Sequence, residues 1–377
     1  MYRLGLRTHG CLERRQARLL AFLHVHKRYR RARWGILSRY FETFVGAVVP
    51  ALRDKSESVS VVAPARLHLG FLDMNGELGR IFGSLGLALY GVETRLTVWR
   101  APELTAGGPS NRRALRFGRS LLSAYRLECG AHLELESAIP EHAGLGSGTQ
   151  LALAVSAALT RLFGREDDLG SLALISERGA RSGIGLGAFE QGGFLVDGGR
   201  AGHTKVPPII CRLSFPEAWR VILILDGERN GLSGEGECAA FEKLPPMAPG
   251  ISGYLCRLAL MQVLPALVEH DLSSFSRAIA AIQAVVGDYF AEFQGGRYTS
   301  PVVAQALDWF KARDVEGVGQ SSWGPTGFAV VENATKAAEL VQEASSLVSA
   351  KRLCFKVCRA RNEGARVQVN QRARHVG

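Results

Sequence analysis

A glycine-rich segment at residues 140–150, followed by an apolar run at 151–162, constrains the fold of this chain more than any other feature. Its alternating glycines allow the backbone to approach a ligand closely, and the run predicts a helix over 149–162. Ser147 and Gln150 have the spacing of a capping box that starts this helix. Free N–H groups and the positive end of the helix dipole then favour a phosphate or pyrophosphate. The alternative is a plain glycine-rich turn before a core helix.

The overall composition is that of a folded globular protein. The chain has 377 residues and 47% apolar content, which is enough to bury a large core. No run of about 18 apolar residues occurs, and the N-terminus lacks the apolar core of a signal peptide. We therefore expect a cytoplasmic protein that does not associate with membranes. The seven cysteines form no CxxC pair, so neither a zinc site nor a redox motif is indicated.

The positive charge is concentrated in the first 55 residues. Residues 1–55 hold 13 Lys or Arg against three acidic residues, a net of +10, whereas the whole chain carries +11. Such an arm is typical of contact with nucleic acid or an anionic surface. Because the arm has no clear period, we expect a disordered extension or the product of a start codon placed too far upstream, and we expect no nucleic-acid partner.

Beyond this arm the pattern predicts strands first and helices later, with a boundary near residues 200–220. Mixed strands followed by segregated helices favour an α+β fold with two lobes. The predicted strands lie at 93–100, 132–137, 193–197, 221–226, 327–332 and 352–358, and the predicted helices at 149–162, 167–181, 252–270, 272–286, 301–313 and 334–350.

A second glycine-rich segment, residues 317–327, lies between a predicted helix and a predicted strand. Its hydroxyls, amide and glycines suit phosphate oxygens, and the alternative is an ordinary helix-to-strand loop. The first segment is not a P-loop, because Thr149 follows Gly148 where a lysine is required. The glycines of residues 183–188 follow a helix instead of a strand, which argues against a dinucleotide fold.

The order of three motifs resembles the GHMP kinase superfamily. These motifs are residues 63–70, 140–150 and 317–327, and the match extends from about residue 59 to 369. Within the superfamily, residues 80–86, 182–194 and 319–325 are most similar to the β-ribofuranosylaminobenzene 5′-phosphate synthase family.

The resemblance implies a GHMP kinase-like fold of two lobes. The N-terminal lobe, residues 56–210, is expected to be ribosomal protein S5 domain 2-like and to carry the glycine-rich phosphate loop. The C-terminal lobe, residues 211–377, is expected to be ferredoxin-like.

The resemblance also implies an activity. Members of the family join phosphoribosyl pyrophosphate to 4-aminobenzoate or 4-hydroxybenzoate and release CO2 and pyrophosphate, in tetrahydromethanopterin biosynthesis. It further implies assistance by Mg²⁺ or another divalent cation, and we expect a homodimer. Asp73, Asp197, Asp226 and Glu235 are candidate helpers for the cation, although a cation held by substrate phosphates needs few protein ligands.

Three groups of residues carry the expected site. Arg66 is the candidate to orient the benzoate carboxylate, and His68 or Glu190 to accept a proton from its para substituent. Each has a purely structural alternative: Arg66 could form an ion pair, His68 could be a hydrogen-bonded strand histidine, and Glu190 could cap a turn. The phosphate-binding candidates are Gly144, Leu145, Gly146, Ser147, Gly148, Thr149, Ser321, Ser322, Gly324 and Thr326, and the substrate-binding candidates are Arg80, Ser84, Gln191, Gln320 and Trp323.

Two other functions compete with this one. A GHMP small-molecule kinase would use ATP, but Ile184 and Gly185 stand where many of these kinases place an acidic base. A non-catalytic ligand sensor on the same fold would use the basic arm to contact nucleic acid.

Overall fold

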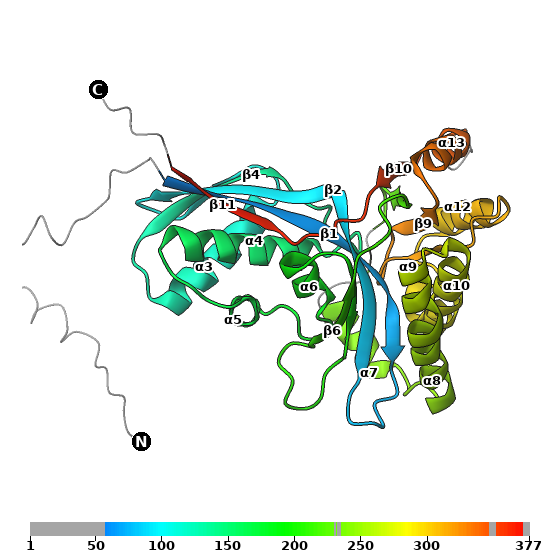
Figure 1. The fold of residues 1–377 in the computed structure, drawn as a ribbon. Coiled ribbons are helices and arrows are strands. Elements are labelled where there is room, and N and C mark those ends of the chain that lie inside the picture. Colours follow the sequence, from blue (N-terminus) through cyan, green and yellow to red (C-terminus); the bar gives the residue numbers. More distant parts are fainter. Residues whose placement is uncertain (1–56, 230, 232–234, 347–351, 372–377) are drawn as a thin grey trace, which may run out of the picture. The chain divides into compact units, whose positions relative to one another are not determined.

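The computed structural model describes residues 57–229, 231, 235–346 and 352–371, and all of them belong to one compact unit. The predicted N-terminal extension, residues 1–55, lies outside the described residues. The predicted division into lobes at 56–210 and 211–377 stays a prediction. The predicted α+β class is confirmed, because two antiparallel-rich sheets are each covered by helices (Figure 1).

Two long strands, β1 and β2, organise a seven-stranded sheet. The order is β11-β1-β2-β4-β3, while β5 pairs with the first part of β2 and β6 pairs with β5. Every pair is antiparallel except β3 with β4. The strands are β1 (Glu57–Asp73), β2 (Phe82–Ala101), β3 (Thr105–Gly107), β4 (Gly130–Ser137), β5 (Phe194–Asp197), β6 (Ile209–Leu213) and β11 (Arg366–Gln371).

The helices α3 to α6 lie along one face of this sheet (Figure 1). The central one, α4, packs on β1 and β2 and is buried along almost its whole length, which explains why its sequence is apolar on all sides. The helices are α3 (Asn111–Tyr125), α4 (Ser147–Leu162), α5 (Leu169–Ile175) and α6 (Ile184–Glu190).

The predicted helix over 167–181 is wrong in its extent. Asp168 caps α5 by accepting a hydrogen bond from the Ser171 N–H, but the helix ends after Ile175. The Ser176 hydroxyl donates to the carbonyl of Leu172, and the chain then turns through a positive φ at Glu177. The segment after α5 is therefore a loop, and it carries two arginines to the candidate site described below.

The second sheet has four strands in the order β10-β7-β9-β8. Strand β7 is apolar on both faces because both are covered. Val221 and Leu223 enter the core shared with the first sheet, whereas Ile222 and Ile224 pack under α12 and α13. The strands are β7 (Arg220–Asp226), β8 (Val318–Gln320), β9 (Gly327–Val331) and β10 (Leu353–Cys358).

The remaining helices surround the second sheet. The predicted helix over 252–270 begins earlier, at Pro249, and contains a π-helical turn between two α-helical parts. These helices are α7 (Glu235–Lys243), α8 (Pro249–Leu258), η1 (Ala259–Val263), α9 (Leu264–Glu269), α10 (Leu272–Tyr289), α11 (Ala291–Gln294), α12 (Pro301–Lys311) and α13 (Ala334–Ala344).

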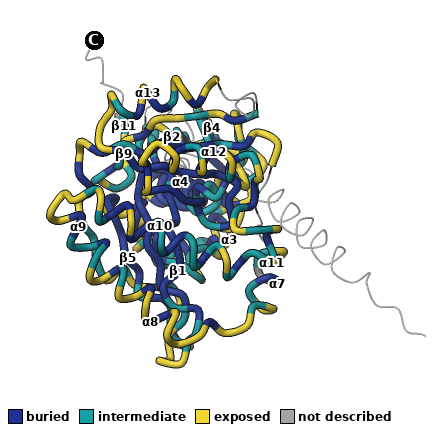
Figure 2. The backbone as a smooth tube through the Cα atoms, turned by 90° about the vertical axis from the view of Figure 1, so that its right-hand side faces the viewer, coloured by how far each residue is buried: buried dark blue, intermediate teal, exposed yellow. Residues whose placement is uncertain are grey.

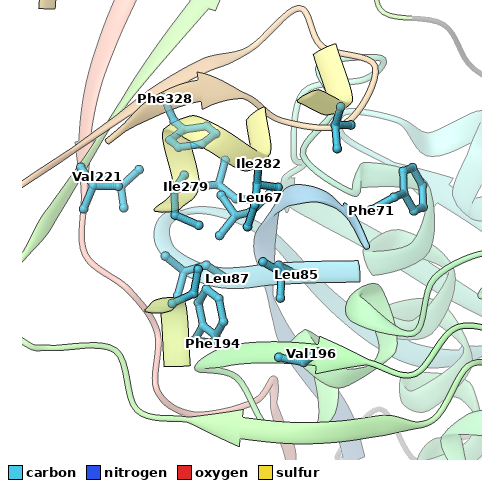
Figure 3. Packing of buried hydrophobic residues seen from close by; sticks show 14 of the residues in the cluster. Leu67, Phe71, Leu85, Leu87, Phe194, Val196, Val221, Ile279, Ile282 and Phe328 are labelled. Atoms are coloured by element: carbon cyan, nitrogen blue, oxygen red, sulfur yellow. The ribbon is translucent and has the colours of Figure 1, made fainter. Parts of the chain in front are cut away.

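The largest core cluster joins the two sheets. Leu67 of β1 lies against Ile279 and Ile282 of α10, with Phe328 of β9 beside them (Figure 3). Buried backbone is concentrated in the middle of the unit and exposed segments lie at its rim (Figure 2). The core therefore fixes the strand that carries Arg66 against elements from both halves of the chain.

Among the described residues, the stretch Pro249–Glu269 is long enough and apolar enough to cross a membrane. Its inner face packs into the protein, where Leu255, Val263 and Leu267 are buried. Helices that pack in a protein core share this length and composition, so the two properties alone do not identify a membrane span.

Replacing Phe275 with alanine should lower the free energy of unfolding by about 3–5 kcal/mol, because a large buried ring is lost from the core. Phe275 is 1% exposed and contacts Phe194, Phe215 and Trp219. Urea unfolding of Phe275→Ala measures the change. The matched control is Leu78→Ala, at a side chain that is 84% exposed. Equal stabilities for the two variants would contradict this account of the core.

Candidate functional site

The three sequence motifs meet at one place, where β1 lies between the two glycine-rich loops. The Arg66 N–H donates to the Leu145 carbonyl at 3.1 Å, and the Ser322 N–H donates to the His68 carbonyl at 3.2 Å. The Ser321 hydroxyl accepts from the His68 N–H at 3.0 Å and donates to the Gly144 carbonyl at 2.7 Å. The two hydrogen bonds of the Ser321 hydroxyl thus join segments that are 253 and 177 residues apart in the sequence.

Gly144 is required by this contact. Its φ is +73°, and a Cβ atom there would lie 2.3 Å from the Ser321 carbonyl oxygen. The Gly144 carbonyl also accepts a hydrogen bond from Arg66 Nη1 at 2.7 Å. Glycine at this position therefore allows both loops to close on β1.

The start of α4 differs from the predicted capping box. Gly146, with a φ of +80°, is the N-cap residue, and no side chain caps the helix. Gln150 turns away and donates from Nε2 to the Gly185 carbonyl at 2.7 Å, so the capping-box prediction is wrong. The N–H groups of Ser147, Gly148 and Thr149 belong to the first turn, where no helical acceptor exists for them.

Two arginines face this first turn. A Cβ atom on Gly148 would lie 3.2 Å from Arg113 Nη2 and 3.4 Å from Arg178 Cζ. Arg113 is paired with Glu141 at 2.9 Å. Arg178 Nε is buried and, among the described residues, has no hydrogen-bond partner. Helix amides and two guanidinium groups together favour a ligand of high negative charge.

The charge balance at this turn also favours an anion. Burial lowers the pKa of Arg178, and the positive charges of Arg116 and Arg113 lower it further. Like charges that crowd together while partly buried destabilise one another, and a bound anion removes this cost.

Arg66 lies deeper and has a carboxylate nearby. Burial lowers the pKa of Arg66 to about 10, an effect that the negative charge of Glu237 opposes. Glu237 pairs with Arg181 at 2.7 Å. Burial raises the pKa of Glu237 even though Arg181, Arg66 and Arg178 oppose the rise. The Arg181 guanidinium also lies over the Phe241 ring, 5.2 Å from its centroid.

The environment of His68 makes this side chain a poor base. His68 is 3% exposed, and burial followed by the charge of Arg66 lowers its pKa to about 3. The imidazole is therefore neutral at physiological pH. Its Nε2 atom is buried without a hydrogen-bond partner among the described residues, and its ring packs on Phe71 at 4.5 Å.

The second glycine loop supports the first. Ser321 and Thr326 are buried, and the Ser321 N–H donates to the Thr326 carbonyl. Gln320 accepts from the Thr299 N–H at 2.7 Å and donates to Gln294. Trp323 packs in an aromatic cluster, 4.3 Å from the Phe290 ring and 5.5 Å from the Phe241 ring. Ser322 and Gly324 both have positive φ, which shapes the turn around these contacts.

The other predicted substrate residues lie elsewhere. Arg80 donates from Nε and Nη2 to the carbonyls of Gly198 and Gly199, both at 2.8 Å. Ser84 is fully buried and donates to Asp197 at 2.5 Å. Glu190 and Gln191 are exposed at the C-terminal end of α6, where their side chains contact each other at 3.2 Å.

The candidate helpers for a divalent cation already hold protein donors. Asp197 accepts hydrogen bonds from Ser84, Ser182 and the N–H groups of Gly183 and Gly199. Asp226 pairs with Arg352 and Ser300, and Asp73 accepts from two N–H groups of its own turn. The Glu235 side chain lies outside the described part of the chain. Within that part, no three His, Cys, Asp or Glu side chains gather as a metal site.

Four charged residues at the site were not predicted from the sequence: Arg113, Arg178, Arg181 and Glu237. One signal was available for Arg113, because a cation in the first turn of a helix opposes the helix dipole and so suggests another role. Arg178 and Arg181 lie within the predicted helix over 167–181, where cations near the C-terminal end are common and do not indicate a ligand site. Nothing near Glu237 in the sequence indicates that it pairs with them.

Models of two known families match this chain: the GHMP kinases N terminal domain at residues 112–193 and the GHMP kinases C terminal domain at 263–350. Among solved structures, L. major mevalonate kinase in complex with R-mevalonate aligns with a TM-score of 0.59 at 14% identity, covering 79% of this chain and 95% of that one. A putative homoserine kinase from Listeria monocytogenes aligns with a TM-score of 0.58 at 16% identity, covering 82% and 99%. The predicted GHMP kinase-like fold is thus confirmed.

More similar sequences define the family. Beta-ribofuranosylphenol 5′-phosphate synthase from Archaeoglobus fulgidus is 33% identical over 285 residues, which cover 72% of this chain and 87% of that protein. The enzyme of the same name from Methanothermobacter thermautotrophicus is 30% identical and covers 71% and 87%. The chain belongs to this synthase family, a branch of enzymes with the GHMP kinase fold.

Replacing Arg178 with alanine should weaken the binding of inorganic pyrophosphate about tenfold, since one charge-assisted contact is worth at least about 1.5 kcal/mol. The free energy of unfolding should not fall, because the change removes like-charge repulsion. Calorimetric titration measures the affinity. Arg161→Ala, at the opposite end of α4, is the control. If both variants bind pyrophosphate as the wild type does, the anion site is elsewhere.

The low pKa of His68 predicts a loss of stability in acid. The unfolded chain binds the proton near pH 6.5, but the folded chain binds it only near pH 3. Between these values the unfolded state holds more protons, so stability falls as the pH falls, by up to ~5 kcal/mol. His68→Asn should flatten this part of the curve of unfolding free energy against pH. The same slope in His68→Asn as in the exposed-site control His203→Asn would refute the assignment.

Proposed function

We propose that this enzyme joins phosphoribosyl pyrophosphate to 4-hydroxybenzoate and releases CO2 and pyrophosphate. The relatives are named for a ribofuranosylphenol 5′-phosphate, a product that retains a phenol hydroxyl. Of the two expected acceptors, 4-hydroxybenzoate gives this product directly, whereas 4-aminobenzoate gives an aminobenzene. A place in tetrahydromethanopterin biosynthesis and a cytoplasmic location are parts of the same proposal.

The anion site at the start of α4 is the observation that carries this proposal. The free N–H groups of Ser147, Gly148 and Thr149 and the guanidinium groups of Arg113 and Arg178 converge on one turn. A diphosphate leaving group gains negative charge as its bond to the ribose breaks, so fixed donors at this turn stabilise the transition state more than the ground state. Mg²⁺ would be held mainly by diphosphate oxygens and would supply further neutralising charge.

The bond changes then involve two carbon atoms. The ribose carbon loses the C–O bond to the diphosphate and forms a C–C bond with the ring carbon that bears the carboxylate. The bond from that ring carbon to the carboxylate breaks, CO2 leaves, and its electron pair restores the aromatic ring. The phenol hydroxyl donates electron density during the attack, so a group that accepts its proton assists the reaction.

The structure suggests Glu237 for this proton, in place of His68 and Glu190. A base with a pKa near 3 removes a phenolic proton poorly, and Glu190 is exposed at the far end of α6. Burial raises the pKa of Glu237, which makes its carboxylate a stronger base. The positive charges of Arg66 and Arg181 lie close enough to Glu237 to offset part of this rise in its pKa. The same two arginines, beside the proposed base, can bind the carboxylate of 4-hydroxybenzoate.

A kinase reaction has less support. The two residues that stand where many GHMP kinases place an acidic base have no side-chain group that accepts a proton from a substrate hydroxyl. Ile184 is fully buried in a small cluster with Ala88 and Leu195, and Gly185 lies against Thr149. A phosphoryl acceptor would find no carboxylate at this position.

Carboxyl-labelled 4-hydroxybenzoate, with phosphoribosyl pyrophosphate and Mg²⁺, should release labelled CO2 in proportion to pyrophosphate. Ser147→Tyr should reduce this release at least a hundredfold, because the ring fills the turn that holds the diphosphate. Ser120→Tyr, at an exposed position on α3, is the control and should keep full activity.

Two results would replace the proposal. ADP formation from ATP with a metabolite alcohol, without CO2 release, would identify a kinase. No turnover with any of these substrates, together with salt-sensitive nucleic-acid binding that is lost on deletion of residues 1–55, would identify a sensor.

A further inference from the structure

A groove lies away from the glycine loops, where strands of the two sheets meet. This groove has a volume of about 460 Å³, a size typical of small-ligand sites. Its walls are the bulged part of β2, which includes Tyr90 and Glu93, and the segment between β10 and β11, which includes Arg359 and Arg361. None of its lining residues belongs to either glycine loop, so its ligand does not depend on the proposed function.

The groove carries more positive charge than its own carboxylates neutralise. Four guanidinium groups and two carboxylates line it, which leaves a net charge of +2. Both oxygens of Glu93 are occupied, one by Arg95 at 2.8 Å and the other by Arg361 at 3.1 Å. Arg359 has no ion-pair partner among the described residues, and its guanidinium lies over the Tyr90 ring at 5.3 Å.

Contacts within the protein hold Arg361 and Tyr90 in place before any ligand binds. Arg361 is 2% exposed and donates from Nε to the carbonyls of Glu363 and Gly364. Its guanidinium also lies over the Tyr90 ring, 5.0 Å from the ring centroid. The Tyr90 hydroxyl donates to Glu363 at 2.8 Å. A site whose side chains are already ordered loses little entropy when it binds a ligand.

The backbone of the groove is also fixed, and it touches the strand of the candidate active site. The Tyr90 N–H donates to the Arg359 carbonyl and the Arg361 N–H to the Ala88 carbonyl, both at 2.9 Å. On β1, Pro64 pairs with Glu93 but Ala65 pairs with Leu89, so three residues of β2 bulge outward here. The next residue of β1 is Arg66.

We propose that this groove is a second anion site, which binds a small dianion such as a phosphate monoester or a dicarboxylate through Arg359 and its arginine neighbours. The net charge of +2 matches two negative charges, and planar guanidinium groups bind phosphate and carboxylate oxygens in pairs. The guanidinium groups of Arg359 and Arg361 both lie over the Tyr90 ring, so one aromatic side chain contacts two of the groove's cations.

Calorimetric titration of the full-length Ser147→Tyr variant tests this site, because the tyrosine blocks the first anion site. Succinate and methyl phosphate are titrated separately. We expect one binding site, and we expect the added change Arg359→Ala to weaken it at least tenfold. Arg359 makes no side-chain hydrogen bond or ion pair among the described residues, so its removal should leave folding intact. Binding of both probes indicates recognition by charge, and binding of one identifies the chemistry of the ligand.

The matched control is Arg165→Ala in the same background. Arg165 is likewise exposed and stacked on a tyrosine, 4.1 Å from the Tyr125 ring centroid, but it lies outside the groove. Arg165→Ala should bind the probes unchanged. No binding of either probe, or equal weakening by both alanine changes, would overturn the proposal. CO2 release distinguishes the second anion site from the proposed reaction. The Arg359→Ala single variant should release CO2 at the full wild-type rate. If the wild type itself releases no CO2, only the proposed reaction is refuted.

Discussion

The carbonyl oxygen of Gly144 is the acceptor on which the geometry of the site depends. It receives hydrogen bonds from Arg66 Nη1 and from the Ser321 hydroxyl, each at 2.7 Å. These donors come from β1 and from the loop before β9, so one acceptor joins three segments that are distant in sequence. The N-cap of α4, Gly146, lies two residues after Gly144, and the helix begins at Ser147. The junction therefore orients the start of α4, and the free amides of its first turn point to a fixed place.

The same junction gathers cations that the fold does not neutralise. Burial lowers the pKa values of Arg66 and Arg178. The single carboxylate of Glu237 cannot neutralise the three arginines near it. In the unliganded protein this arrangement costs stability, because buried charges lose hydration and like charges repel. Binding sites commonly carry such a cost, which an anionic ligand offsets when it binds. The site is therefore less stable alone than when it holds an anion.

The sequence predicted the fold and the central loops well, because both depend on local patterns. Glycine spacing and the apolar run located α4, and strand periodicity located β7 and β9 within one or two residues. The errors arose where distant partners decide the outcome. Gln150 bonds to the distant Gly185 instead of capping its own helix. The early end of α5 is a different case, because the Ser176 hydroxyl bonds locally to the Leu172 carbonyl. Arg178 lies near Gly148, and Glu237 lies near arginines of two other segments, and no local spacing in the sequence records these tertiary contacts.

Relatives with this fold include kinases, so the fold alone does not determine the reaction. The resemblance stated above implies that the acidic base of many GHMP kinases would stand at Ile184 and Gly185 of this chain. An acidic side chain beside the first turn would activate a hydroxyl or a water molecule as a nucleophile. Ile184, which is fully buried, and Gly185 offer no such base. For the reaction proposed above this absence is useful, because an oxocarbenium-like ribose carbon reacts with any activated water. Apolar packing at this position therefore favours attack by an aromatic carbon over hydrolysis.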